Sequence, residues 1–159
     1  MHPANPSHLP DSPFADYSLR AASVTDAPAL AALLQQLAPE EPRADARLLA
    51  LRLGELPSHC LVLLAERGGQ LLGTCSLHRI DHLAHNFARS AILEDVVVHS
   101  DARGLGIGQA LLRCAVDKAR AWGCYKLALS SNQSREAAHR FYEKQGFKPH
   151  GVSLALPLT

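Results

Sequence analysis

Three glycines stand within six residues at 103–108, in the sequence RGLGIG. The residues before this run, AILEDVVVHSDA, are rich in β-branched side chains and predict a strand. The residues after it, QALLRCAVDKARAWG, have apolar side chains at helical spacing and predict a helix. A glycine-rich turn at such a junction lets the backbone approach a ligand closely, because glycine has no Cβ atom.

The loop at 103–108 is predicted to bind phosphate. Its N–H groups and the helix N-terminus face the same point, where directed donors and the helix dipole favour an anion. Arg103 adds a positive charge at the start of the loop. The alternative to phosphate binding is a tight turn in which the glycines are needed only for positive φ. The dinucleotide fingerprint fails because Gln109 stands three residues after Gly106, and no Gly-Lys-Ser/Thr sequence indicates a P-loop. The pattern is Arg-x-x-Gly-x-Gly.

Strand and helix patterns continue along the chain and favour an α/β or α+β fold with a mixed sheet. Residues 1–16 predict a flexible N-terminal arm, and residues 17–159 predict a single domain. The helix at 25–37 has Thr25 as its expected N-cap, and the helix at 134–145 has Ser134. Strands are predicted at 17–23, 60–67, 70–80, 90–100, 125–131 and 147–158, and helices at 25–37, 43–56, 108–122 and 134–145.

The composition restricts the function further. The chain has 159 residues, 47% of them hydrophobic, and a formal net charge of +1. This balance argues against a nucleic-acid or membrane-surface binder, and no apolar run reaches membrane-spanning length. The N-terminus lacks the features of a secretory signal. The cysteines, without C-x-x-C spacing, predict buried, reduced thiols in a cytoplasmic protein: Cys60, Cys75, Cys114 and Cys124.

The Arg-x-x-Gly-x-Gly loop resembles the acetyl-coenzyme A loop of the GNAT superfamily of N-acetyltransferases. The segments LRAASVTDAPALAALL, ILEDVVVHSDARGLGIGQALL and AHRFYEKQGF resemble, in turn, the family's opening strand and helix, its cofactor strand, loop and helix, and its closing helix. The resemblance covers nearly the whole chain from Tyr17. It implies a mixed sheet that is splayed open in the middle, with the pantetheine arm of acetyl-CoA along the strand that ends at Val98.

The resemblance also implies which residues contact acetyl-CoA. The pyrophosphate would lie on the amides of residues 104–108. Many relatives have an asparagine seven residues before the tyrosine of the closing helix; here Arg135 stands at that position, and Asn132 could replace the missing amide. The expected cofactor-binding residues are Val96, Val97, Val98, Arg103, Gly104, Leu105, Gly106, Ile107, Gly108, Gln109, Asn132 and Arg135.

Transfer of an acetyl group from a thioester to an amine needs a neutral amine, a polarised carbonyl and a proton for the thiolate. Glu94 and Asp95 lie on the cofactor strand, and a period of two places them on opposite faces. Glu94 is the predicted base, with water as the alternative, because bases of the family often come from this strand. The resemblance implies that a backbone N–H near Val96 or Val97 polarises the carbonyl. Tyr142 is the predicted acid; the alternative is that its ring packs the helix and holds the cofactor.

The segment before the cofactor strand is predicted to bind substrate. Three histidines there raise the alternative of a metal site, but no clear carboxylate or cysteine completes a ligand set, and no metal is expected. The sequence looks closest to the glucosamine 6-phosphate and aminoalkylphosphonate branches, whose substrates are primary amines with an anionic group. Arg135 could also receive that anion. The expected substrate-binding residues are His78, Arg79, His82, His85, Arg89 and Asp95.

The predicted function is acetyl-CoA-dependent acetylation of a small-molecule primary amine by direct attack. A protein or peptide N-acetyltransferase and a non-catalytic acyl-CoA-binding regulator are the alternatives, which a turnover assay would distinguish. No nucleic acid or membrane partner is expected. The apolar C-terminal segment VSLALPL could pair across a homodimer interface.

Overall fold

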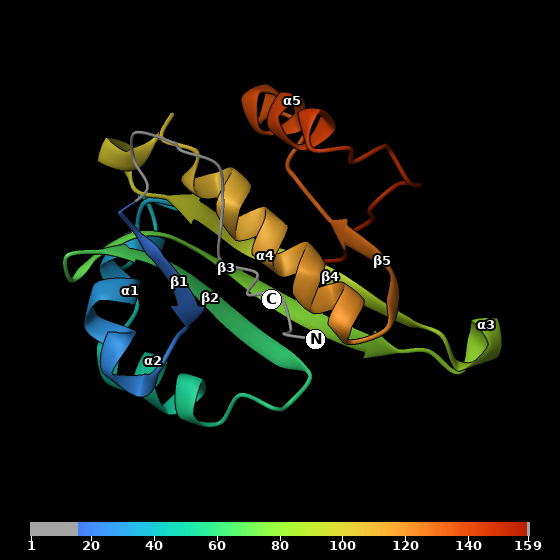
Figure 1. Cartoon of the computed structure of the whole chain (residues 1–159), viewed down its shortest axis with the longest axis horizontal. Coiled ribbons are helices and arrows are strands. Elements are labelled where there is room, and N and C mark those ends of the chain that lie inside the picture. The colour runs from blue at the N-terminus through green and yellow to red at the C-terminus, as the bar shows by residue number, and fades with distance from the viewer. Residues whose placement is uncertain (1–15, 159) are drawn as a thin grey trace, which may run out of the picture.

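The structure is a computed structural model that describes residues 16–158 (Figure 1). Its strands are β1 (Ser18–Ala21), β2 (Cys60–Arg67), β3 (Gln70–Asp81), β4 (Arg89–Val98) and β5 (Cys124–Leu129). They form one sheet in the order β1-β2-β3-β4-β5. The first four strands are antiparallel to their neighbours, and β5 is parallel to β4. The predicted mixed sheet is therefore confirmed.

The strands form where the sequence alternates or is continuously apolar, and glycines make the tightest turn between them. Gly68 and Gly69 connect β2 to β3 with φ values of 56° and 80°. Two consecutive positive φ angles match the twist of a two-residue hairpin, which glycine adopts without strain. Arg67 consequently pairs with Gln70 directly across the turn.

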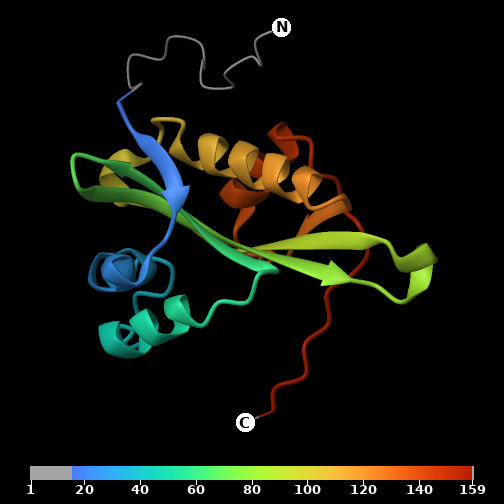
Figure 2. The ribbon, with the colours of Figure 1, turned by 60° about the horizontal axis from the view of Figure 1, so that its bottom comes forward.

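Helices cover both faces of the sheet (Figure 2). One face carries α1 (Ala27–Leu34), preceded by the 3₁₀ turn η1 (Val24–Asp26), and α2 (Ala46–Gly54). The other face carries α4 (Ile107–Ala121) and α5 (Glu136–Lys144), with the 3₁₀ turn η2 (Ser100–Ala102) leading into the loop before α4.

Gly73 of β3 allows α4 to approach the sheet closely. A Cβ atom at this position would lie 2.9 Å from a methyl group of Leu111 and 3.0 Å from one of Ile107. Leu111 and Ile107 are buried in the larger core cluster between α4 and the sheet, and a smaller cluster packs under α1. The close approach sets the position of α4, and with it the position of the glycine loop at its N-terminus.

The helix starts differ from the sequence predictions. Ser23, rather than Thr25, precedes the first helical turn, and its backbone N–H donates to Asp26 at 2.7 Å. Arg135, rather than Ser134, precedes α5, and it makes no side-chain cap. Ser134 instead donates its backbone N–H and its hydroxyl to the Asn132 side chain at 2.9 and 2.8 Å. An Asx-type turn therefore leads into α5 and delays its start.

The strand predicted at 147–158 is wrong. The residues have no strand structure, and Val152, Leu154, Leu156 and Leu158 are 82–90% exposed. Alternating apolar residues indicate which side chains share a face, but a strand also needs a backbone partner. Pro149 and Pro157 lack an N–H donor, which weakens any pairing further.

The segment between β3 and β4 is polar, as predicted, but it ends in a strained turn. The residues of α3 (Ala84–Phe87) include His85, Asn86 and Phe87 with φ values of 54°, 56° and 59°. Three successive left-handed residues are unusual outside glycine. The β3–β4 hairpin protrudes from the body of the molecule with α3 at its tip (Figure 1 and Figure 2).

The four cysteines are free thiols, and Cys75 is buried while the other three are partly accessible. Burial raises the pKa of Cys75 to about 12. None of the helices in residues 16–158 is both long and apolar enough to cross a membrane. Almost all of the arm predicted at 1–16 lies outside the described residues.

An ion pair between β1 and the first helical turn gives the fold a predictable pH dependence. Arg20 donates to the two carboxylate oxygens of Asp26 at 2.8 and 2.7 Å. These bonds, chiefly, and the Ser23 donors hold the pKa of Asp26 well below its usual value of 3.8. Because the folded pKa lies below the unfolded one, the stabilisation is present above about pH 4 and is lost as the pH falls below it.

We therefore expect Asp26→Asn to lower the free energy of unfolding by about 1–3 kcal/mol at pH 7. The difference from the wild type should shrink between pH 5 and pH 2, measured by urea unfolding. Asp117→Asn is the control, because Asp117 is an exposed partner of Arg120 on α4 and its loss should change stability by less than about 0.5 kcal/mol. An equal loss at pH 7 and pH 3 for Asp26→Asn would contradict the ion-pair explanation.

Candidate active site

β4 loses its neighbour β5 halfway along its length. The parallel pairing runs from Arg89 opposite Cys124 to Leu93 opposite Leu129, and in the described chain it goes no further. On its other side β4 stays paired with β3 as far as Val98. The second half of β4 therefore has one backbone edge without a strand partner, at the place where the resemblance implies a splayed sheet.

A β-bulge lies at this parting. Ser76 of β3 is opposite Glu94, but Thr74 is opposite Val97, so β4 contains one extra residue. Asp95 has a φ of 52°, in the left-handed region. The strict alternation predicted for Glu94 and Asp95 is interrupted by this bulge: both residues are exposed, and both line the cavity beside it.

A cavity of about 200 Å³ opens beside the bulge. The cavity lies between the separated strands and α5. Its walls include Glu94, the predicted base, Tyr142, the predicted acid, and Arg135, a predicted cofactor-binding residue. Its lining residues are Leu37, Leu93, Glu94, Asp95, Val96, Leu129, Ser130, Ser131, Arg135 and Tyr142.

Tyr142 reaches this cavity from α5. Its ring packs edge-on against Phe141 and Phe147, with centroids 5.2 and 5.7 Å away, and it adjoins the larger core cluster. Burial raises the pKa of the Tyr142 phenol above its usual value of 10, although the charge of Arg135 acts in the opposite direction. The phenol is therefore protonated at neutral pH and can donate a hydrogen bond into the cavity.

Sequence reasoning missed the serine pair that follows β5. The Ser131 hydroxyl oxygen is buried and has no hydrogen-bond partner among the described residues. A buried polar atom without a partner is unfavourable by about 1–3 kcal/mol, which a bound ligand can offset. No sequence pattern predicts this buried hydroxyl, because its burial depends on how β5 and α5 pack around the cavity.

The glycine loop reaches α4 through two left-handed glycines. Gly104 and Gly106 have φ values of 79° and 78°, and a Cβ atom on either would meet nothing within 4 Å. The backbone at both glycines therefore has open space beside it. The first amides of α4, from Ile107 to Gln109, have no acceptor within the helix. These features fit a phosphate, which needs converging donors and a close backbone.

Other predicted cofactor residues have partners inside the protein. The Leu105 amide donates to the Ala102 carbonyl at 3.3 Å, and Arg103 donates to the Val98 carbonyl at 3.5 Å. A Cβ atom on Gly108 would lie 3.4 Å from the ring of Phe141, an ordinary contact distance, so Gly108 faces α5 rather than open space.

Asn132 does not line the cavity. Its side-chain oxygen accepts the hydrogen bonds of the turn before α5. The replacement of the family's asparagine by Asn132 remains a prediction, and the structure places Arg135 in the cavity wall instead.

The structure does not bring the predicted substrate-binding residues of the β3–β4 hairpin into the cavity. They have partners of their own: Arg79 and Arg89 both bind Asp81, at 3.0 and 2.9 Å. His82 lies 2.7 Å from the Ser90 hydroxyl, and His78 lies 3.1 Å from the Cys60 sulfur. His85 packs 6.2 Å from His82. Within residues 16–158, no three His, Cys, Asp or Glu side chains cluster as metal ligands would.

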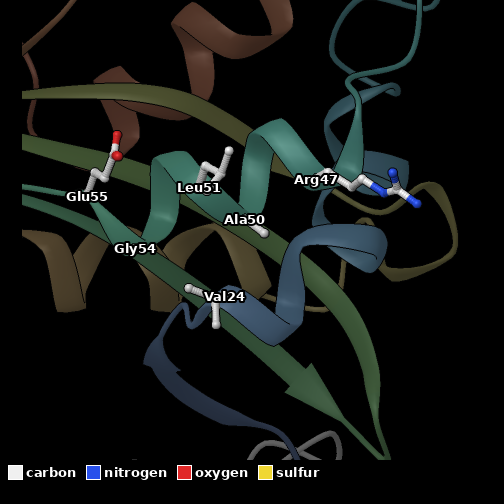
Figure 3. Close-up of a pocket in the computed structure, with 6 residues that line it drawn as sticks. All are labelled: Val24, Arg47, Ala50, Leu51, Gly54 and Glu55. Carbon is white, nitrogen blue, oxygen red and sulfur yellow. The ribbon is translucent and has the colours of Figure 1, made fainter.

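A second cavity, of about 530 Å³, lies between η1 and α2 (Figure 3). Its lining is mostly apolar, from Val24, Ala50 and Leu51, and its charged side chains, Arg47 and Glu55, stand at opposite ends of α2 (Figure 3). It lacks the combination of acid, base and donors found at the bulge. The smaller cavity is therefore the candidate active site.

Comparison with known proteins identifies the family to which the sequence belongs. The sequence matches the acetyltransferase (GNAT) family over residues 27–147. It is 41% identical over 86 residues to aminoalkylphosphonate N-acetyltransferase of Salmonella typhimurium, covering 54% of each chain. It is 36% identical over 90 residues to glucosamine 6-phosphate N-acetyltransferase of Trypanosoma brucei brucei, covering 57% of this chain and 59% of the relative. The chain thus spans little more than half the length of these two curated relatives.

A longer alignment and the solved structures agree with this match. Glucosamine 6-phosphate N-acetyltransferase 1 of Oryza sativa subsp. japonica is 33% identical over 128 residues, covering 78% of this chain and 76% of the relative. An acetyltransferase structure from Trypanosoma brucei superposes with a TM-score of 0.77 at 29% identity, covering 90% of this chain and 100% of the other. Glucosamine-6-phosphate N-acetyltransferase from Arabidopsis thaliana shares the fold, with a TM-score of 0.79 at 23% identity, covering 90% and 99%. With most of its length matched, the chain belongs to the GNAT acetyltransferase family.

Proposed function

We propose that this chain transfers the acetyl group of acetyl-CoA to the primary amine of a small, anionic substrate. The observation that carries the proposal is the cavity at the bulge of β4, where Glu94, Arg135 and Tyr142 lie together beside the unpaired length of the strand. Relatives named for glucosamine 6-phosphate and aminoalkylphosphonate acetylation support the substrate class.

Acetyl-CoA supplies the acetyl group as an activated thioester. Its pyrophosphate would bind the amides at the start of α4, where Gly104 and Gly106 leave open space above the backbone. The unpaired edge of β4 at Val96–Val98 offers N–H and C=O groups to an extended ligand, as an added strand would use them. The chain would thus hold both ends of the donor with backbone groups.

Glu94 would take the proton of the attacking amine, directly or through a water. Alkyl amines have pKa values of about 10, so most arrive protonated and must lose a proton before attack. Glu94 is exposed at the cavity wall, where its carboxylate can meet an incoming ammonium. A backbone N–H at Val96 or Val97, turned by the bulge, would polarise the carbonyl.

Tyr142 would donate to the sulfur as the thiolate leaves. Its ring contacts the rings of Phe141 and Phe147, and its phenol stays protonated at neutral pH. Because it approaches from α5 and Glu94 from β4, the acid and the base would act from different walls of the cavity.

Arg135 would receive the anionic group of the substrate. No carboxylate pairs with it among the described residues, whereas Arg79 and Arg89 share Asp81. Binding an anion at Arg135 therefore breaks no existing ion pair. Turnover assays should show a kcat/KM at least about tenfold higher for an aminoalkylphosphonate than for the matched neutral amino alcohol, as expected for a charge-assisted contact.

Arg135→Gln should remove most of that preference, and Arg140→Gln is the control because Arg140 lies on α5 but pairs with Glu136 outside the cavity. Equal rates for the charged and neutral amines would argue against the anion site. Acetyl transfer to peptides but not to small amines would show that the substrate is a protein or peptide. Binding of acetyl-CoA without turnover of any amine would favour a non-catalytic regulator.

Donor binding is tested at the glycine loop. Gly106→Val should weaken acetyl-CoA binding at least about tenfold, because a branched side chain would fill the space above a left-handed residue. Gly123→Val is the matched control: Gly123 has a φ of 74°, also faces open space, and lies beyond the other end of α4. Calorimetry on folded variants should separate the two. Equal affinities would remove the loop from the donor site.

The role of Tyr142 is tested by Tyr142→Phe. The ring and its packing remain, and only the hydroxyl is lost. We expect kcat to fall by about 10²–10⁴-fold, the usual range for a positioned proton donor. The affinity for acetyl-CoA should change little, because the lost interaction strengthens mainly in the transition state. A rise in KM for acetyl-CoA at constant kcat would show instead that the tyrosine holds the donor.

A further inference from the structure

We propose that Ser76 and Asp95 form a positioning pair that fixes the bulge of β4. In this pair the Asp95 carboxylate holds the backbone rather than the substrate. The effect on turnover rests on the proposed function, because it concerns the backbone N–H groups that would face the acetyl carbonyl. The pair itself is a feature of the two strands and can be measured without turnover.

The geometry of the two strands supports this role. Ser76 lies on β3, opposite Glu94 and beside the extra residue of β4. Its hydroxyl donates to the Asp95 carboxylate at 3.1 Å. Ser76 is only 9% exposed, so its hydroxyl depends on a protein partner more than a surface hydroxyl would. The hydrogen bond therefore joins a nearly buried donor to the bulged residue.

The backbone of Asp95 explains why the bulge needs support. A φ of 52° is unfavourable for most residues, and aspartate is among the few that tolerate it. The left-handed turn is what shifts the register and turns the following residues of β4 away from strict alternation. The bulge at Asp95 also lies just beyond Leu93, the last residue of β4 that pairs with β5, so β5 does not support this part of the strand.

The hydrogen bond from Ser76 gives the adjacent carboxylates of Glu94 and Asp95 different roles. Asp95 points a carboxylate oxygen at β3, where Ser76 occupies it. Glu94 has no hydrogen-bond donor of its own among the described residues and lies exposed at the cavity wall. Glu94 is therefore free for the amine, and Asp95, which sequence reasoning assigned to the substrate, serves the conformation of the strand.

Four single variants and one double variant distinguish the effect of conformation from that of charge. Asp95→Ala loses the hydrogen bond and disfavours positive φ, and should lower kcat by about 10–100-fold through misplaced donors, with KM for acetyl-CoA nearly unchanged. Asp95→Asn keeps an acceptor for Ser76, and Asp95→Gly keeps the conformation, so both should recover most of that loss. Ser76→Ala should lower kcat by about 3–10-fold in the Asp95 protein but have no effect in the Asp95→Gly background.

Amide hydrogen exchange tests the pair independently of turnover. Residues 94–98 should exchange faster in Ser76→Ala and Asp95→Ala than in the wild type, and at nearly the wild-type rate in Asp95→Asn. The amides of β2 are the internal control and should not change. Unchanged exchange in Ser76→Ala would overturn the pair.

Kinetic outcomes can overturn it as well. If Asp95→Asn loses activity as strongly as Asp95→Ala while its exchange is normal, the charge of Asp95 acts on the substrate and the positioning role is wrong. If the folded wild type neither binds acetyl-CoA nor acetylates any amine, the proposed function fails, and the effect on turnover fails with it. Faster exchange in Ser76→Ala would then still support the pair as a feature of the strand.

Discussion

β4 has strand partners on both sides only as far as Leu93, and the rest of the site follows from that parting. Backbone N–H and C=O groups inside a sheet need partners, so half a strand left open in the middle of the fold is costly unless water or a ligand completes it. The bulge at Asp95 lies where the pairing ends and turns the open edge. The candidate base lies beside this edge on β4, and α5 brings the candidate acid to it from the opposite wall.

Glycine serves close packing at one position of this fold and leaves space for a ligand at others. Gly73 is a glycine because neighbouring side chains occupy the space that a Cβ atom would need, whereas a Cβ atom on Gly108 would make only an ordinary contact with Phe141. Gly104 and Gly106 have open space beside them and positive φ values. Gly73 thereby allows α4 to lie close against the sheet. Gly104 and Gly106 leave the N-terminus of α4 uncovered, where its free amides and dipole favour an anion.

Periodicity predicted most of the fold because strands β2 to β5 and helix α4 carry strong local patterns. The glycine loop was predictable for a different reason: glycine adopts positive φ more readily than other residues, and Gly104 and Gly106 both do so. The bulge was not predictable, since AILEDVVV contains no regular alternation that an extra residue would break, and the extra residue appears only in the register of β4 against β3. Ser131 was equally hidden, because its importance depends on what lies around it. The histidines near 80 were assigned to a substrate site because their segment comes just before the cofactor strand, where relatives bind substrate. In the structure these histidines do not line the cavity, because β3 and β4 extend beyond it.

The raised pKa of Tyr142 limits how its phenol can assist a departing thiolate. Thiols have an ordinary pKa of about 8.5, and burial lifts the pKa of this phenol above 10. Full transfer of its proton to the sulfur is therefore uphill, whereas a hydrogen bond to the developing negative charge gains strength from the same buried surroundings. Tyr142, as the proposed acid, would therefore stabilise the developing charge with a hydrogen bond first, and its proton would follow only as the thiolate leaves. Glu94 is exposed at the cavity wall while Tyr142 is partly buried, so a proton taken from the amine by Glu94 would return to the phenol through water.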